Sequence, residues 1–169
     1  KFPKGLYIDL ANLRLKSNNK EKKVKSNTKI NYGNYYALII GNNNYLHLPR
    51  LKTAVNDAVD MSKVLQEDYG FIVKTLKNAS RSEIMGVLYE LRKKLKANDN
   101  LLIYYAGHGS LDEEIDVGYW HPIDSEEDNP SNWISVADIS SQLMAFKAKH
   151  IMVIADSCYS GTLVRGLAP

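Results

Sequence analysis

Apolar residues occur along the chain in short continuous runs and in longer stretches with helical spacing. Continuous runs cover residues 36–40, 101–105 and 151–155, and Phe71 to Leu76 is a further apolar segment. Runs of this length are typical of strands that are buried on both faces of a parallel sheet. The pattern therefore predicts four core strands.

Helical patterns separate these strands. Apolar residues from Leu51 to Leu65 recur at i, i+3, i+4 and i+7 spacing, with Thr53 as the expected N-cap and Asp57 in or near the first turn. Ser80 and Glu83 have the spacing of a capping box before a second apolar face. A shorter helix is expected to open near Ser135.

Alternating strands and helices predict right-handed crossovers, and hence an α/β fold with a mostly parallel sheet and helices on both faces. Ligands of such sheets bind beyond the carboxyl ends of the strands. A sheet that ended on the last predicted strand would leave an apolar edge unpaired, so we expect further sequence, either a second subunit or a C-terminal half.

Length and composition narrow the class of protein. A chain of 169 residues predicts one domain, and no apolar run approaches the roughly 20 residues that span a bilayer. No signal peptide is recognisable at the start. The single cysteine excludes an internal disulfide and a multi-cysteine zinc site, which favours a reducing, cytoplasmic setting.

The charge is unevenly distributed. Residues 1–34 carry nine Lys and Arg against two Asp and Glu, whereas residues 35–169 carry thirteen against seventeen. We interpret residues 1–34 as a basic linker or N-terminal extension leading from an upstream domain, and residues 35–169 as the folded domain. Nucleic-acid binding is the weaker interpretation, because no aromatic residue is interleaved with the lysines.

Two residues can supply covalent chemistry. His108 and Cys158 each follow a predicted strand, so both should reach the carboxyl edge of one sheet. A histidine within about 3–4 Å takes the proton of a thiol, and the imidazolium then stabilises the thiolate nucleophile. The alternatives are a buried structural thiol and a histidine that only completes a turn. The N–H groups of Gly109 and Cys158 are candidates to bind a tetrahedral oxyanion.

Three other histidines compete for the role of base: His47, His121 and His150. None has glycines on both sides at the end of a strand. We therefore expect them to be structural or exposed at the surface.

Two motifs carry a resemblance to a known family. The segments Tyr-Tyr-Ala-Gly-His-Gly, residues 104–109, and Asp-Ser-Cys-Tyr-Ser-Gly, residues 156–161, resemble the large subunit of caspase-like cysteine peptidases, closest to the metacaspase, paracaspase and bacterial orthocaspase branch. The resemblance covers Tyr35 to Leu163. It implies a caspase-like three-layer sandwich whose small-subunit strands are missing from this chain. It also implies His108 as general base, Cys158 as nucleophile, and Gly109 with Cys158 as oxyanion donors.

The substrate preference follows from the same resemblance. True caspases have glutamine two residues before the nucleophile, where this chain has Asp156. Asp57, in Asn-Asp-Ala, matches a second metacaspase position, and in that branch the two carboxylates form the S1 pocket. Two acids in one pocket need a cation between them, which implies cleavage after Arg or Lys. The alternative for Asp57 is an ordinary acid in the first turn of a helix.

An acidic stretch between Leu111 and Trp133 contains no basic residue. Its spacing fits no EF-hand loop, so a solvated loop is the expected structure. The resemblance implies no required cofactor and no metal in the site, with calcium as a candidate activator.

Together these observations predict a cysteine endopeptidase made as a regulated zymogen and activated by proteolysis. Its partners would be protein substrates with Arg or Lys at P1, the C-terminal small-subunit segment of the same precursor and an upstream regulatory domain, with neither nucleic acid nor membrane. Two alternatives stay open. One is a catalytically silent caspase-like scaffold that binds partners, and the other is a flavodoxin-like nucleotide-binding domain, for which Gly41 supplies a single glycine and no Walker lysine follows.

Overall fold

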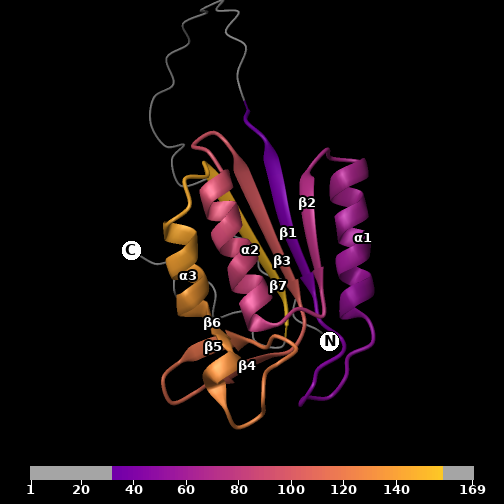
Figure 1. The fold of residues 1–169 in the computed structure, drawn as a ribbon, viewed down its shortest axis with the longest axis vertical. Coiled ribbons are helices and arrows are strands. Elements are labelled where there is room, and N and C mark those ends of the chain that lie inside the picture. The colour runs from indigo at the N-terminus through magenta and orange to yellow at the C-terminus, as the bar shows by residue number, and fades with distance from the viewer. Residues whose placement is uncertain (1–31, 158–169) are drawn as a thin grey trace, which may run out of the picture.

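The computed structural model describes residues 32–157 and forms a central parallel sheet covered by helices on both faces (Figure 1). The sheet contains β1 (Tyr35–Gly41), β2 (Ile72–Lys77), β3 (Asn100–Ala106) and β7 (His150–Asp156), in the order β2-β1-β3-β7. All neighbouring strands are parallel. The predicted α/β class is confirmed, and each strand extends one residue beyond its predicted end.

The helices divide between the two faces. Helix α1 (Ala54–Glu67) covers one face, whereas α2 (Arg81–Lys94) and α3 (Val136–Met144) cover the other. The strand order reverses between β1 and β3, because β2 lies on one side of β1 and β3 on the other. Ligand sites in such sheets form at this switch point, beyond the carboxyl ends of the strands.

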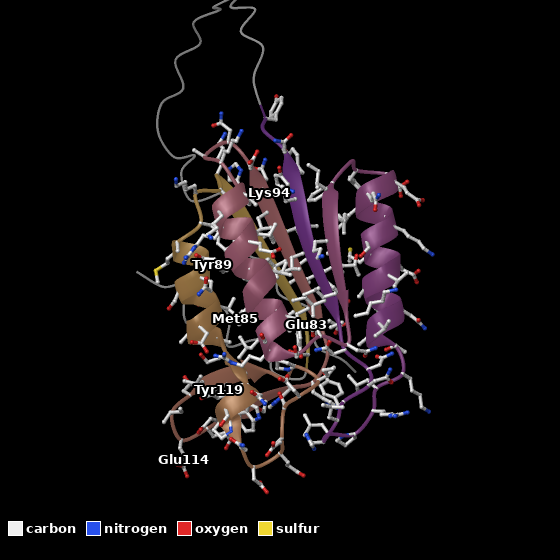
Figure 2. The ribbon with its side chains drawn as sticks, viewed as in Figure 1. Glu83, Met85, Tyr89, Lys94, Glu114 and Tyr119 are labelled. Atoms are coloured by element: carbon white, nitrogen blue, oxygen red, sulfur yellow. The ribbon has the colours of Figure 1, made fainter. Side chains whose placement is uncertain are left out.

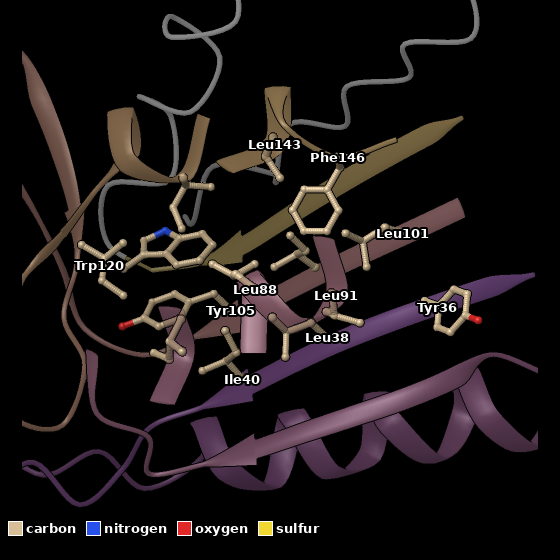
Figure 3. Close-up of a cluster of buried hydrophobic side chains, with 14 of the residues drawn as sticks. Tyr36, Leu38, Ile40, Leu88, Leu91, Leu101, Tyr105, Trp120, Leu143 and Phe146 are labelled. Atoms are coloured by element: carbon tan, nitrogen blue, oxygen red, sulfur yellow. The ribbon is translucent and has the colours of Figure 1, made fainter. Parts of the chain in front are cut away.

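The two faces of the sheet have separate cores. Tyr105, Trp120 and side chains from α2 and α3 form the larger cluster, part of which is drawn in Figure 3. Its tightest aromatic contact is the parallel stack of Tyr105 on Trp120, with ring centroids 4.5 Å apart. Tyr104 belongs instead to the cluster under α1. Consecutive strand residues point to opposite faces, so these two tyrosines send their rings in opposite directions.

The acidic stretch was predicted as a solvated loop, and this holds for part of it, since Glu113, Glu114, Asp116 and residues 126–128 are exposed. The rest is not a loop: the stretch and its borders contain the short strands β4 (Gly109–Asp112), β5 (Val117–Trp120) and β6 (Ile134–Ser135) and the 3-10 helix η2 (Pro130–Asn132). The three strands form a small antiparallel sheet at the carboxyl end of the main sheet. Figure 2 shows Tyr119 on this sheet and the exposed Glu114 at its outer end. Strands of two to four residues are too short to give a recognisable period.

The predicted caps had different outcomes. Ser80 and Ser135 both form capping boxes, with Glu83 and Asp138. Thr53 precedes α1 but makes no side-chain capping bond. The Val55 N–H of the first turn donates instead to Asn43 Oδ1 at 3.2 Å, so a loop residue distant in sequence caps this helix.

The last core strand was predicted to be buried on both faces, and this was wrong. The five inner residues of β7 are only partly buried, because β3 is the one strand that pairs with β7 within the described part of the chain. Among residues 32–157, no helix is long and apolar enough to cross a membrane.

Candidate active site

His108 lies between β3 and β4, at the carboxyl end of the main sheet. Its Nε2 atom lies 2.8 Å from the carbonyl oxygen of Pro49, in the loop after β1. A carbonyl only accepts hydrogen bonds, so Nε2 carries the hydrogen and Nδ1 of the neutral ring has the free lone pair. The Pro49 carbonyl therefore selects the tautomer in which Nδ1 has the free lone pair, as a base at this position would need.

Two tyrosines hold the backbone of His108. The His108 N–H donates to Tyr45 Oη at 2.7 Å, and the Tyr45 and His108 rings lie 4.7 Å apart. Tyr105 Oη donates to the His108 carbonyl at 2.7 Å. A Cβ atom on Gly107 would lie 2.6 Å from both tyrosine hydroxyls, so this close support requires glycine before His108. Burial raises the pKa of the Tyr45 hydroxyl, which keeps it protonated.

The end of β7 lies against the segment that carries His108. The Gly107 N–H donates to the Asp156 carbonyl at 3.4 Å. A Cβ atom on Gly109 would lie 3.0 Å from Ser157 Oγ. The segments on both sides of His108 therefore contact the two residues that precede Cys158, while Cys158 itself lies outside the described residues.

Gly109 was predicted to donate its N–H to an oxyanion. It begins β4 and is paired with Trp120 of β5. The neighbouring pair is hydrogen bonded, because the His121 N–H donates to the His108 carbonyl at 3.0 Å. Hydrogen-bonded and non-hydrogen-bonded pairs alternate in antiparallel sheets, so the Gly109 N–H points away from β5.

Besides burial, the two predicted S1 carboxylates both raise the pKa of one hydroxyl group, that of Tyr104. Asp57 lies in the first turn of α1, and Asp156 ends β7. The pKa of Tyr104 is raised to about 12 by burial, then by the charges of Asp156 and Asp57 and by a hydrogen bond with Asp156. Both carboxylates are exposed, and neither has a Lys or Arg partner within the described ranges. The carboxyl end of the sheet thus has an acidic site on its α1 side.

Close packing fixes the position of Asp57. A Cβ atom on Gly41, at the end of β1, would lie 2.5 Å from the Ala54 carbonyl oxygen and 2.6 Å from Ala58 Cβ. The absence of a side chain at this point lets the first turn of α1 approach the sheet.

The other histidines occupy different surroundings. His47 is exposed in the loop after β1, and His150 lies at the opposite end of the sheet, with Nδ1 2.8 Å from Asn100 Oδ1. His121 is 5% exposed and follows β5, and its Nε2 lies 2.8 Å from Ser110 Oγ. Burial, and then the charge of His108, lower the pKa of His121 to about 4, so its ring is neutral at pH 7.

The metal-ligating potential of the described residues is small. Within 32–157, no three or more His, Cys, Asp or Glu side chains are grouped as metal ligands. Part of the acidic stretch is used by the fold itself: Asp124 accepts the Arg81 N–H at 2.9 Å, and Asp112 accepts the Glu114 N–H at 3.0 Å. Calcium activation stays a prediction.

Comparison with known proteins identifies the family. The family model described as caspase domain matches residues 34–167. The chain belongs to the caspase domain family. This confirms the predicted resemblance. It also separates the chain from flavodoxin-like domains, whose strand order is the same as that of β1, β2, β3 and β7.

Similar proteins include metacaspases from fungi and plants. Metacaspase-1A of Aspergillus oryzae is 27% identical over 153 residues, covering 77% of this chain and 35% of the relative. Metacaspase-7 of Arabidopsis thaliana is 31% identical over 143 residues, covering 76% of this chain and 35% of the relative. The chain therefore spans about a third of the length of these relatives.

A solved structure is also similar. The crystal structure of protein GSU0716 from Geobacter sulfurreducens superposes with a TM-score of 0.63 and 25% identity. The match covers 79% of this chain and 53% of that chain.

Proposed function

We propose that this chain is the large-subunit part of a cysteine endopeptidase that cleaves after Arg or Lys. The arrangement of His108 carries the proposal: Nε2 is held by the Pro49 carbonyl and Nδ1 is left as the base. The predicted nucleophile, Cys158, directly follows Ser157 in the sequence, and Ser157 borders the His108 loop.

The reaction follows from these roles. Cys158 transfers its thiol proton to His108 Nδ1, and the thiolate attacks the scissile carbonyl. The N–H groups of Gly109 and Cys158 bind the oxyanion. Collapse of this intermediate breaks the C–N bond as His108 protonates the leaving amine. Water then attacks the thioester with His108 as base, releasing the acid product and the thiol.

The basic preference rests on Asp57 and Asp156. A guanidinium or ammonium group between these exposed carboxylates removes their mutual repulsion, and an Arg side chain offers two donors to one carboxylate. An aspartate at P1 would be repelled by both, at a cost of several kcal/mol. Tyr104, whose hydroxyl is bonded with Asp156, orients that carboxylate.

The regulation proposed here concerns sequence outside the described residues. A small-subunit segment of the same precursor would add strands to the exposed edge of β7, and proteolysis beyond Pro169 would activate the zymogen. A thiol nucleophile without a disulfide partner fits a cytoplasmic location.

The test uses the full-length protein with fluorogenic peptides ending in Arg, Lys or Asp, with and without calcium. We expect turnover after Arg and Lys that is lost in Cys158→Ala and in His108→Ala. Asp57→Asn and Asp156→Asn should each lower kcat/KM for Arg peptides. Turnover only after Asp would refute the S1 assignment, and a thiol probe that labels Cys158 without any turnover would favour the silent scaffold.

A further inference from the structure

A pocket of about 200 Å³ adjoins His108 on the side of the small antiparallel sheet. Leu48 and Pro49 from the loop after β1 form one wall, and His121 and Trp133 form the other. The His121 and Trp133 rings meet edge to face, with centroids 4.7 Å apart. The proposed function leaves this pocket unused.

The pocket and the acidic site lie on opposite faces of the sheet. Tyr104, whose hydroxyl is bonded with Asp156 and whose pKa is raised by burial and by the charges of Asp156 and Asp57, packs in the cluster under α1. Tyr105 packs in the cluster under α2 and α3, and its hydroxyl oxygen also lies 2.8 Å from the carbonyl oxygen of His121, so its single hydrogen is shared between the carbonyls of His108 and His121. His108 follows both tyrosines at the strand end, so it stands between the acidic site and the pocket.

The order of acidic site, His108 and pocket determines the direction in which a bound substrate peptide runs. A P1 side chain between the carboxylates places the scissile carbonyl at the strand end. The leaving amine must lie at His108, because His108 protonates it. The residue carrying that amine therefore continues toward the far side of His108, where the pocket is.

We propose that this pocket is a specificity site for the residue that follows the scissile bond, P1′, and that it selects a large apolar side chain such as Phe or Leu. The proposal rests on the proposed function. A cavity of about 150 Å³ lined by apolar side chains binds benzene, so a pocket of this size accommodates a phenyl or isobutyl group.

The residues that line the pocket determine which class of P1′ side chain it binds. Leu48, Pro49 and the Trp133 ring are apolar, and the Trp133 Nε1–H is already bonded to the Glu126 carbonyl at 2.8 Å. Nε2 of the buried His121 lies 2.8 Å from Ser110 Oγ, and Nδ1 has no hydrogen-bond partner within residues 32–157. The lowered pKa of His121, about 4, keeps this ring uncharged at pH 7, so it offers no cation to an anionic side chain. Glu127 lines the pocket and is exposed, so it disfavours an acidic P1′ residue further.

The test uses internally quenched peptides that share Arg at P1 and differ at P1′, where they carry Phe, Leu, Gly, Lys or Asp. With the full-length protein, we expect kcat/KM for Phe or Leu to exceed that for Gly about tenfold, the range of a hydrophobic pocket. Asp should be the poorest. Leu48→Trp, which fills the pocket, should reduce the Phe-to-Gly ratio to about 2 or less.

Leu46→Trp is the matched control, because Leu46 belongs to the same loop, is 66% exposed and does not line the pocket. It should keep the Phe-to-Gly ratio of the unaltered protein. Rates that differ less than about twofold among the P1′ residues, with cleavage after Arg intact, would overturn the pocket assignment and leave the proposed function standing. A preference for Lys would overturn it as well, since Glu127 would then dominate. Absence of cleavage after Arg in every peptide would overturn both.

Discussion

His121 should make the folded domain sensitive to mild acid. Its imidazole is 5% exposed, and burial together with the charge of His108 lowers its pKa from 6.5 to about 4. In the unfolded chain the same ring is solvated and takes up a proton near pH 6.5. Below that pH the unfolded state binds the additional proton and the folded state does not, so stability falls as the pH falls.

The size of the effect follows from the two pKa values. A full separation of about 2.5 pH units corresponds to about 3 kcal/mol, reached only near pH 4. Between pH 7 and pH 5 the expected loss in the free energy of unfolding is about 2 kcal/mol. This window avoids the acid range in which carboxylates protonate, including Asp99, whose pKa is lowered first by its hydrogen bond with the Lys96 N–H.

Urea unfolding followed by circular dichroism at several pH values between 7 and 5 measures this loss. His121→Gln keeps a donor near Ser110 Oγ and removes the titrating ring, so most of the dependence on pH should disappear. His47→Gln removes an exposed histidine instead, and this variant should keep the dependence of stability on pH. An unchanged slope in His121→Gln would refute the argument, because the proton uptake would then belong to another group.

Three further substitutions test the support of the site. Gly107→Ala introduces a Cβ atom 2.6 Å from the two tyrosine hydroxyls that hold His108, and should lower kcat about 10- to 100-fold in the peptide assay. Gly86→Ala, at an exposed position of α2 where the new Cβ meets no atom within 4 Å beyond its own stretch of helix, should raise the free energy of unfolding by about 0.5–1 kcal/mol. Asn42→Ala leaves the buried N–H of Ala79 without its 2.9 Å partner and should cost about 1–3 kcal/mol in urea unfolding.

Each of these has its own contrary result. Gly86→Ala doubles as the control for Gly107→Ala, since it makes the same chemical change away from the site. Equal kcat in both variants would mean that the tyrosines do not position His108. A loss of stability in Gly86→Ala would contradict the open space around Gly86, because it would mean that the added methyl group clashes with a neighbouring atom. For Asn42→Ala, stability equal to that of Asn44→Ala, an exposed neighbour, would argue against the buried bond.

The elements with long apolar patterns could be predicted from the sequence. The four strands of the main sheet and the three helices stand within a few residues of their expected places, because burial on a sheet face or along a helix face imposes a period. The capping box at Ser80 was also predicted, since it depends on two residues only three positions apart, and the start of a helix near Ser135 was predicted without its capping box. The small antiparallel sheet was not, because its short strands depend on pairing rather than on pattern.

The candidate active site also has features that the sequence predicts and features that it does not. The sequence alone determined which residues have reactive or charged side chains, and that His108, Asp156 and Cys158 follow strands of one parallel sheet. It could not determine that a backbone carbonyl, that of Pro49, holds Nε2 of His108, because every residue has such a carbonyl. Nor could it place Tyr45, 63 positions away, under the His108 backbone.

Only the tertiary structure brought Asp57 and Asp156 to one hydroxyl group and His121 to the other side of His108. These relations join segments far apart in the chain, and they depend on the close approach of α1 at Gly41 and on the opposite directions of Tyr104 and Tyr105. Local propensities and motifs are properties of neighbours in sequence. The distances that set a proton's position or a pocket's boundary arise when the sheet and its helices pack.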